Sequence, residues 1–298
     1  MRQTAILASE MKPFFSITRH VYIFIRKIYN GAITIIFIPN PHTGIPKPHI
    51  FRTLIFSSSF FLCQSSIATG TCIMAIRTPT QVVVAADSLG VPFGAATTIK
   101  KQTFCKIAHQ DSIYFAFSGY VVELESGFDA YGIAREALSG NGTTLEKVKR
   151  FDELIQARLP IAVKSMNKTY KDEATFVNAV FLGFENGAPF VFARGYKAVV
   201  SVFNTVGVAI FPNDCPGLTC PNSPNGITHT ILGKRDTINR IIASGLTITD
   251  TNAIAAVKIL VESEIAADIN NVNIAPPVDV ISIDKTGVHW IQKKDECK

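Results

Sequence analysis

The chain has no internal repeat, and beyond residue 70 it has no excess of charge of either sign. Seven of its 29 lysines and arginines lie in residues 1–70, together with one of its 23 acidic residues, so residues 71–298 carry 22 charges of each sign. A region with balanced charge lacks the basic patch with which proteins bind nucleic acids. The formal net charge of +6 therefore belongs to the N-terminal extension, and we expect no nucleic-acid partner.

Hydrophobic runs long enough to cross a bilayer are also missing. A spanning helix needs about 20 consecutive apolar residues. The apolar stretch at residues 21–38 is interrupted by Arg26 and Lys27, and the run at residues 53–62 is too short. We therefore expect no stable membrane span in the mature protein.

Residues 47–68 have the three regions of a secretory signal peptide. Lys47 and Arg52 precede the short apolar run, and Ser66 and Ala68 provide the small residues for a peptidase cut after Ala68. A secreted or periplasmic location follows from this pattern. If translation in fact starts further downstream, the protein is instead cytoplasmic.

The domain organisation predicted is a targeting segment or pro-segment at residues 1–70, which is removed, and one domain at residues 71–298. The second segment is long enough to bury one core. Residues 1–45 lie unusually far upstream for a signal peptide, so a disordered or organelle-targeting leader remains an alternative there.

The cysteines after residue 70 lack the spacing of a zinc site, and no pair of histidines accompanies them. We expect neither a metal nor a cofactor. Cys215 and Cys220 lie in a segment rich in proline, asparagine and glycine, residues 212–226. In an oxidising compartment these two residues would form a local disulfide.

Two short apolar runs on either side of a turn-forming tetrapeptide predict a β-hairpin. Residues 72–77 form the first strand, residues 78–81 (Thr-Pro-Thr-Gln) the turn, and residues 82–86 the second strand. The return of the chain then brings Asp87 beside Thr71.

In these residues the chain resembles the N-terminal-nucleophile hydrolases of the proteasome family, both the β subunits and their bacterial relatives. The family pattern is a Gly-Thr cleavage point, a hairpin and an aspartate sixteen residues after the threonine, which Gly70-Thr71 and Asp87 match. Lys106 corresponds to the catalytic lysine, although it lies about three residues further from the aspartate than usual, and Ser118-Gly119 corresponds to the turn that follows. The resemblance covers about residues 70–292.

The resemblance implies an α+β fold, a four-layer αββα sandwich of two mainly antiparallel sheets. It implies a threonine-type amide hydrolase, a peptidase, that is activated by cleavage between Gly70 and Thr71. Asp87, Lys106 and Gly119 would complete the catalytic set. Phe117, two residues before Gly119, would line the pocket for the substrate side chain before the scissile bond and favour small apolar residues.

The chemistry of this set follows from the residue types. A threonine hydroxyl needs a base, and a free α-amino group on Thr71, with a pKa of about 7.7–8.0, supplies one. The Lys106 ammonium would lower that pKa by like-charge repulsion, and Asp87 would hold Lys106 in place. The backbone N–H of Gly119 would stabilise the oxyanion.

Helices are predicted where apolar residues recur at helical spacing, and strands where apolar runs are bounded by turn residues. The predicted helices are residues 123–138, residues 145–167 with a kink or break at Pro160, residues 238–243, and a last long helix around the stripe Ile254, Val257, Val261 and Ile265, capped by Asp250 or Thr251. The predicted strands are residues 113–117, 175–184, 189–194 and 197–206, with a closing hairpin at residues 277–288. Residues 232–236 match the glycine-containing turn that the family places near its active site.

One part of the family pattern is missing. Active proteasome subunits have an aspartate and a serine just before the closing hairpin, where this chain has the segment 268–277, with Asn271 and Asn273 as the nearest candidates. Two alternatives to a peptidase therefore stay open: a catalytically inactive structural or binding member of the fold, and an acylase that hydrolyses small amides. The expected partner is a peptide or small-amide substrate, and a homo-oligomer is also left open.

Overall fold

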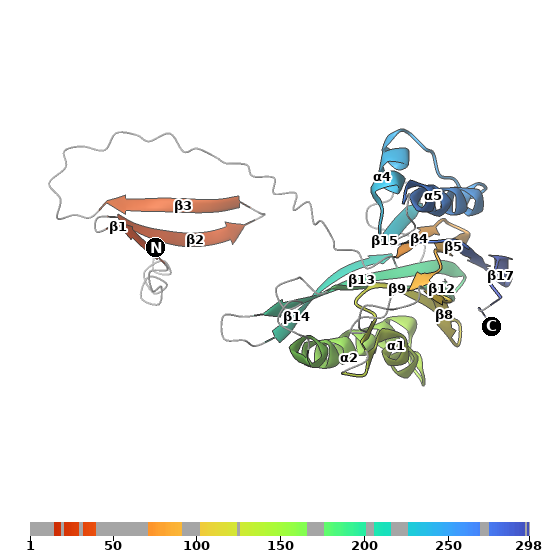
Figure 1. The fold of residues 1–298 in the computed structure, drawn as a ribbon, viewed down its shortest axis with the longest axis horizontal. Coiled ribbons are helices and arrows are strands. Elements are labelled where there is room, and N and C mark those ends of the chain that lie inside the picture. The colour runs from red at the N-terminus through yellow and green to blue at the C-terminus, as the bar shows by residue number, and fades with distance from the viewer. Residues whose placement is uncertain are drawn as a thin grey trace. The chain divides into compact units, whose positions relative to one another are not determined.

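The computed structural model describes residues 15–18, 21–29, 32–39, 71–90, 102–123, 126–165, 176–200, 206–215, 226–268, 274–295 and 297. The chain divides into two compact units, residues 1–65 and residues 66–298 (Figure 1). The first unit contains one antiparallel sheet with the strands β1 (Phe15–Thr18), β2 (Val21–Tyr29) and β3 (Ala32–Pro39). Of the apolar stretch that the sequence shows at residues 21–38, residues 21–29 and 32–38 therefore lie in two strands.

The second unit contains a five-stranded sheet built around the predicted hairpin. Its strand order is β15-β4-β5-β16-β17, and every neighbouring pair is antiparallel. The bounds are β15 (Thr228–Gly233), β4 (Cys72–Arg77), β5 (Gln81–Ala86), β16 (Asp279–Asp284) and β17 (Gly287–Gln292). The predicted first hairpin and the predicted closing hairpin are both confirmed.

The other large sheet has the strand order β14-β13-β12-β9-β8 and is also antiparallel throughout. Its strands are β8 (Ile107–Gln110), β9 (Ile113–Gly119), β12 (Phe176–Glu185), β13 (Ala188–Val200) and β14 (Val206–Cys215). The two strands predicted at residues 189–194 and 197–206 are wrong in one respect, because β13 runs unbroken through Gly195 and Tyr196 between two partner strands.

Four helices lie in the described part of this unit: α1 (Ala130–Leu138), α2 (Thr144–Ser165), α4 (Asp236–Ala243) and α5 (Ala253–Ala267). The helix predicted from residue 123 begins only at Ala130. Residues 122–123 (β10) pair with residues 128–129 (β11), and the Asp129 side chain then accepts a hydrogen bond from Tyr131 N and caps α1. Helix α2 continues through Pro160 as one helix.

The predicted caps of the last helix are also wrong. Asn252 occupies the N-terminal cap of α5, and the Asp250 carboxylate instead accepts hydrogen bonds from Thr78 and Thr80 of the β4–β5 turn. A further short antiparallel pair, β6 (Leu89–Gly90) with β7 (Gln102–Thr103), follows the hairpin.

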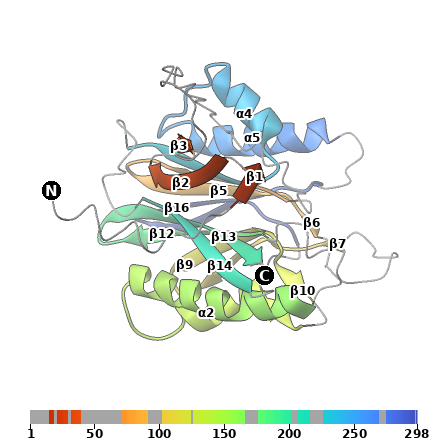
Figure 2. The same cartoon turned by 90° about the vertical axis from the view of Figure 1, so that its left-hand side faces the viewer.

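Three hydrophobic clusters hold the second unit together. One lies between the β8–β14 sheet and helices α1 and α2, and a second between the β4–β5 sheet and helices α4 and α5. The third joins the facing sides of the two sheets and includes Ile73, Val84, Ala116, Val180 and Ile281. The two views in Figure 1 and Figure 2 show the helix pairs beside different sheets. The unit is therefore an α+β structure with two mainly antiparallel sheets.

Within the residues that are described, no helix is both long enough and apolar enough to span a membrane.

Candidate active site

The β4–β5 hairpin places Thr71 and Asp87 next to each other, as the sequence predicts. Ile73 pairs with Ala86 in the ladder, and Asp87 N donates to Cys72 O at 3.0 Å. In return, Cys72 N donates to Asp87 Oδ1 at 2.7 Å. The residue before β4 and the residue after β5 therefore lie at the same end of the sheet.

Lys106 reaches this pair from the segment that leads into β8 of the other sheet. Its Nζ lies 2.6 Å from Asp87 Oδ1 and donates to Thr71 Oγ1 at 3.0 Å. Asp87 is 0% exposed, Lys106 1% and Thr71 7%. The three side chains form a buried line of polar groups in the order carboxylate, ammonium, hydroxyl, which brings together the three residues that the sequence nominates.

Backbone donors complete the surroundings of the Asp87 carboxylate. Its Oδ2 accepts a hydrogen bond from Leu89 N at 3.0 Å and another from Ala275 N at 3.4 Å. Together with Cys72 N and Lys106 Nζ, four donors surround a carboxylate that has no exposed surface. Such a network compensates the cost of burying the charge.

Burial also changes how easily the pair exchanges a proton. Removal from water lowers the pKa of Lys106, although the charge of Asp87 opposes that change. Burial likewise raises the pKa of Asp87, against the opposing charge of Lys106. Lys106 therefore gives up a proton more readily than an exposed lysine does, and it does so 3.0 Å from a hydroxyl.

A glycine-containing turn holds the backbone of Thr71. Lys234 N donates to Thr71 O at 2.8 Å, and Gly233, with φ +81°, pairs with Cys72 in the β15–β4 ladder. Lys234 Nζ lies 3.1 Å from Asp268 Oδ1. The other carboxylate oxygen, Asp268 Oδ2, accepts a hydrogen bond from Ile274 N at 3.1 Å. The segment before the closing hairpin thus supplies a carboxylate, Asp268, which pairs with the side chain of Lys234, the residue whose backbone N–H binds Thr71 O.

Gly233→Ala should displace the backbone of Thr71. A Cβ at this position would lie 2.0 Å from Thr71 O, and a positive φ alone costs a non-glycine residue about 1–3 kcal/mol. We expect a loss of thermal stability, measured by calorimetry, that exceeds the cost of the positive φ alone. Gly245→Ala is the control, because its φ is also positive but nothing lies within 4 Å of the added Cβ. Equal losses of stability in the two variants would contradict a role of Gly233 at Thr71.

Tyr131 is a neighbour of the site that the sequence patterns do not reveal. Its hydroxyl donates to Lys106 O at 2.8 Å from helix α1. The side chain is buried, and burial raises the pKa of its hydroxyl, so the group stays protonated and keeps donating. A tyrosine on a helix 25 residues from Lys106 carries no local signal of this contact.

Ser118 and Gly119 end β9, the strand next to β8, and Gly119 pairs with Val177 of β12. The role of the Gly119 N–H as an oxyanion donor stays a prediction. Phe117 is 1% exposed, and its ring contacts Tyr131, Phe151 and Phe181 in the core beneath helices α1 and α2. Phe117 is therefore a core residue, and its additional role in a substrate pocket also stays a prediction.

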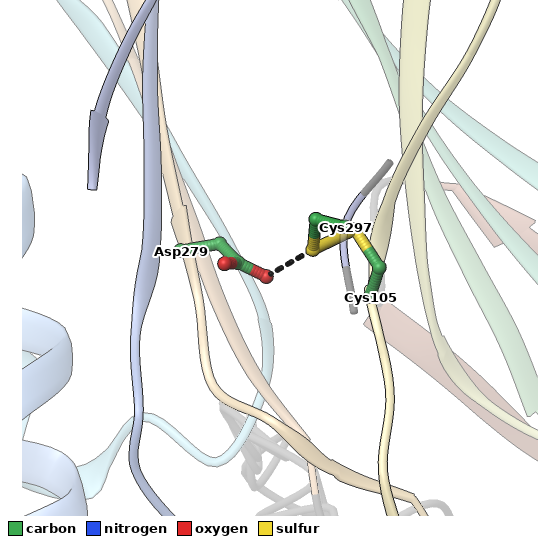
Figure 3. Close-up of side chains that lie close together, drawn as sticks. All are labelled: Cys105, Asp279 and Cys297. Atoms are coloured by element: carbon green, nitrogen blue, oxygen red, sulfur yellow. Dashed lines mark hydrogen bonds between the residues drawn. A yellow bond between two sulfur atoms is a disulfide. The ribbon is translucent and has the colours of Figure 1, made fainter. Parts of the chain in front are cut away.

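Close to Lys106, Cys105 and Cys297 form a disulfide with a Cα–Cα distance of 5.1 Å. Asp279 lies beside it, with Oδ2 3.1 Å from Cys297 Sγ (Figure 3). These three residues are close enough to suggest metal ligands. The two sulfurs are bonded to each other, however, and Asp279 Oδ2 already lies 2.7 Å from Lys294 Nζ. The group is thus a disulfide beside an ion pair.

Two nominated positions cannot be placed. Gly70, on the other side of the predicted cleavage point, lies outside the described residues. The same holds for Cys220, and of Cys215 only the backbone in β14 is described, so the predicted Cys215–Cys220 disulfide remains a prediction.

No protein-family model and no curated protein matches this chain.

Proposed function

We propose that the chain is the precursor of an N-terminal threonine hydrolase that cleaves amide bonds, a peptidase, with Thr71 as its nucleophile. The observation that carries this proposal is the position of Lys106 Nζ, buried between Asp87 Oδ1 at 2.6 Å and Thr71 Oγ1 at 3.0 Å. A buried ion pair whose ammonium donates to a hydroxyl favours loss of the hydroxyl proton, because the positive charge stabilises the oxygen as it becomes negative.

In the proposed reaction, the free α-amino group of Thr71 takes the proton from Oγ1 as this oxygen attacks the substrate carbonyl carbon. The Lys106 ammonium, which donates to Oγ1, stabilises the negative charge that develops there. The same charge keeps the neighbouring amine neutral near pH 7. Asp87 fixes Lys106 through the 2.6 Å contact and balances its charge.

The tetrahedral intermediate then collapses to an ester on Thr71 Oγ1, and the proton on the α-amino group passes to the departing amine. Water attacks the ester in the second half of the reaction and regenerates the hydroxyl. The Gly119 N–H is the proposed donor to the oxyanion, and loss of one such donor costs about 3–4 kcal/mol in the barrier.

The fold that we infer for residues 71–298 is the four-layer αββα sandwich of the N-terminal-nucleophile hydrolases. The hydrophobic clusters between the two sheets and on the helix-covered face of each sheet support it. We also propose that the protein is exported, and the Cys105–Cys297 disulfide supports this proposal because disulfides persist in oxidising compartments.

The N-terminus of the active protein tests the proposal. The mature form should begin at Thr71, since any residue left before it ties up the α-amino group in a peptide bond. Intact mass and N-terminal sequencing of the purified active protein make the measurement. A stable N-terminus at Thr69 or further upstream in active protein would rule out this mechanism. A panel of peptides and small amides then separates peptidase from acylase activity.

The rate should pass through a maximum as the pH is raised. It should rise as the Thr71 amine loses its proton, at or below the usual pKa of about 7.7–8.0, and fall as Lys106 loses its proton. Burial lowers the pKa of Lys106, so the falling limb should lie below the usual lysine value of about 10.4. Measured values of kcat/KM across this range test the expectation, and a rate that still rises at about pH 10 would contradict it.

A further inference from the structure

A second buried Lys–Asp pair lies beside the catalytic pair. Lys294 Nζ is 2.7 Å from Asp279 Oδ2, and Lys294 N donates to Asp279 Oδ1 at 2.9 Å. Asp279 is 0% exposed and Lys294 about 1% at its side chain. Asp279 pairs with Ala86, the residue before Asp87, so the two acidic residues stand at the ends of neighbouring strands. The proposed reaction does not use this second pair.

The second pair contacts the segment that carries Lys106. Lys294 Nζ also donates to Phe104 O at 3.0 Å, and the next residue, Cys105, is bonded to Cys297. Cys297 N in turn donates to Lys294 O at 3.1 Å, which links the two contacts (Figure 3 shows the disulfide beside Asp279). The two residues before Lys106 are thus both bonded to the C-terminal segment, Phe104 through a hydrogen bond from Lys294 and Cys105 through the disulfide with Cys297.

This attachment matters because Lys106 does not belong to a regular element. Residues 104–106 connect the two-residue strand β7 to β8, which begins at Ile107. No sheet ladder spans these three described residues, so their position depends on individual contacts. The contacts on their backbone include Phe104 N to Ser88 O at 3.1 Å, Lys294 Nζ to Phe104 O, and Tyr131 Oη to Lys106 O.

We propose that Lys294, Asp279 and the Cys105–Cys297 disulfide form a C-terminal clamp that positions Lys106 against Thr71. This inference rests on the proposed function, and it adds positioning residues to the catalytic set. A displacement of about 1 Å at such a group lowers a rate about 100-fold. Opening the clamp should therefore lower kcat more than it changes KM.

Two kinds of change open the clamp, and each has a matched control. Lys294→Met removes the ammonium, and its control is Lys293→Met, at an exposed neighbour whose ammonium lies over the Trp290 ring. The double substitution Cys105→Ser with Cys297→Ser removes the disulfide. Reduction of the wild-type protein by a dithiol does the same: two electrons and two protons convert the S–S bond to two thiols, while the dithiol becomes a disulfide.

The expected result is a kcat about 10- to 100-fold lower in Lys294→Met, in the double variant and in the reduced wild type. The Lys293→Met control should keep the wild-type kcat, and the double variant should not respond to the dithiol. A second readout does not depend on activity: acylation of Lys106 by a water-soluble active ester, mapped by peptide mass. The buried amine should be labelled slowly in the wild type and at least about tenfold faster once the clamp is open.

The two readouts separate the two proposals. Unchanged labelling of Lys106 in folded variants would overturn the clamp, whether or not the protein hydrolyses amides. Faster labelling with an unchanged kcat would also overturn it, since the clamp would then not position the reacting group. If the variants are labelled faster than the wild type but the wild type itself hydrolyses no amide, the clamp is supported as a structure that holds Lys106, and the proposed function is overturned.

Discussion

Thr71→Ala should abolish amide hydrolysis, with a loss of at least about 1,000-fold, whereas Thr71→Ser should keep a measurable part of the activity. The alanine variant has no Oγ1 to attack the substrate, and Lys106 loses the hydroxyl that it donates to at 3.0 Å. Serine keeps the hydroxyl and lacks only the methyl group. Steady-state rates on a reporter amide measure both variants.

The same substitution should also stop maturation. If Thr71 Oγ1 itself attacks the Gly70 carbonyl, the peptide bond shifts to an ester and is then hydrolysed. The Thr71→Ala variant should then keep the two preceding residues, Thr69 and Gly70, after removal of the signal peptide, and intact mass resolves that difference. A Thr71→Ala protein that has nonetheless lost both of these residues would show that another enzyme removes the segment.

Lys106→Met should lower kcat at least about 100-fold, the scale of a group that handles a proton in the reaction. It should also lower the free energy of unfolding by about 3–5 kcal/mol, because the 0% exposed Asp87 carboxylate loses its counter-charge. Rates must therefore be measured at a temperature at which circular dichroism shows the variant to be folded.

Lys147→Met is the matched control for Lys106→Met. Lys147 is also paired with an aspartate, Asp111, but at 3.7 Å and with an exposed partner. Such a pair contributes at most about 1 kcal/mol, and we expect neither the rate nor the stability to change much. If a folded Lys106→Met protein kept its rate within about tenfold, the assignment of Lys106 to the catalytic set would be wrong.

The parts of the site that could be predicted from the sequence are those with local causes. Two apolar runs and a turn predict the hairpin, and the antiparallel register then places Asp87 beside Thr71. Lys106 lies just before β8 of the other sheet, and in the sequence only its place in the motif order connects it to Thr71 and Asp87. Its extra separation from Asp87 does not prevent the contact, because Lys106 Nζ still lies 2.6 Å from Asp87 Oδ1.

The contacts that the sequence could not predict join distant segments. Cys105 and Cys297 are 192 residues apart, and cysteine spacing alone favours the neighbouring pair Cys215 and Cys220. Tyr131 donates to Lys106 O and Lys294 donates to Phe104 O, and both contacts depend on how distant segments pack together. The predicted start of α1 is wrong because Glu123 and Phe128, which fall within the predicted helix, instead pair with each other in the β10–β11 ladder.

The depth at which Thr71 lies restricts how the precursor can be processed. A protease acting from outside needs several residues on each side of the cleaved bond in an extended, accessible form. Here the residues after that bond are Thr71, 7% exposed, and β4, which is buried along its whole length between β15 and β5. Once the domain has folded, a protease that must bind the residues after this bond therefore cannot reach β4. If the Thr71 hydroxyl makes the cut, we expect maturation to be a first-order event whose rate does not depend on protein concentration.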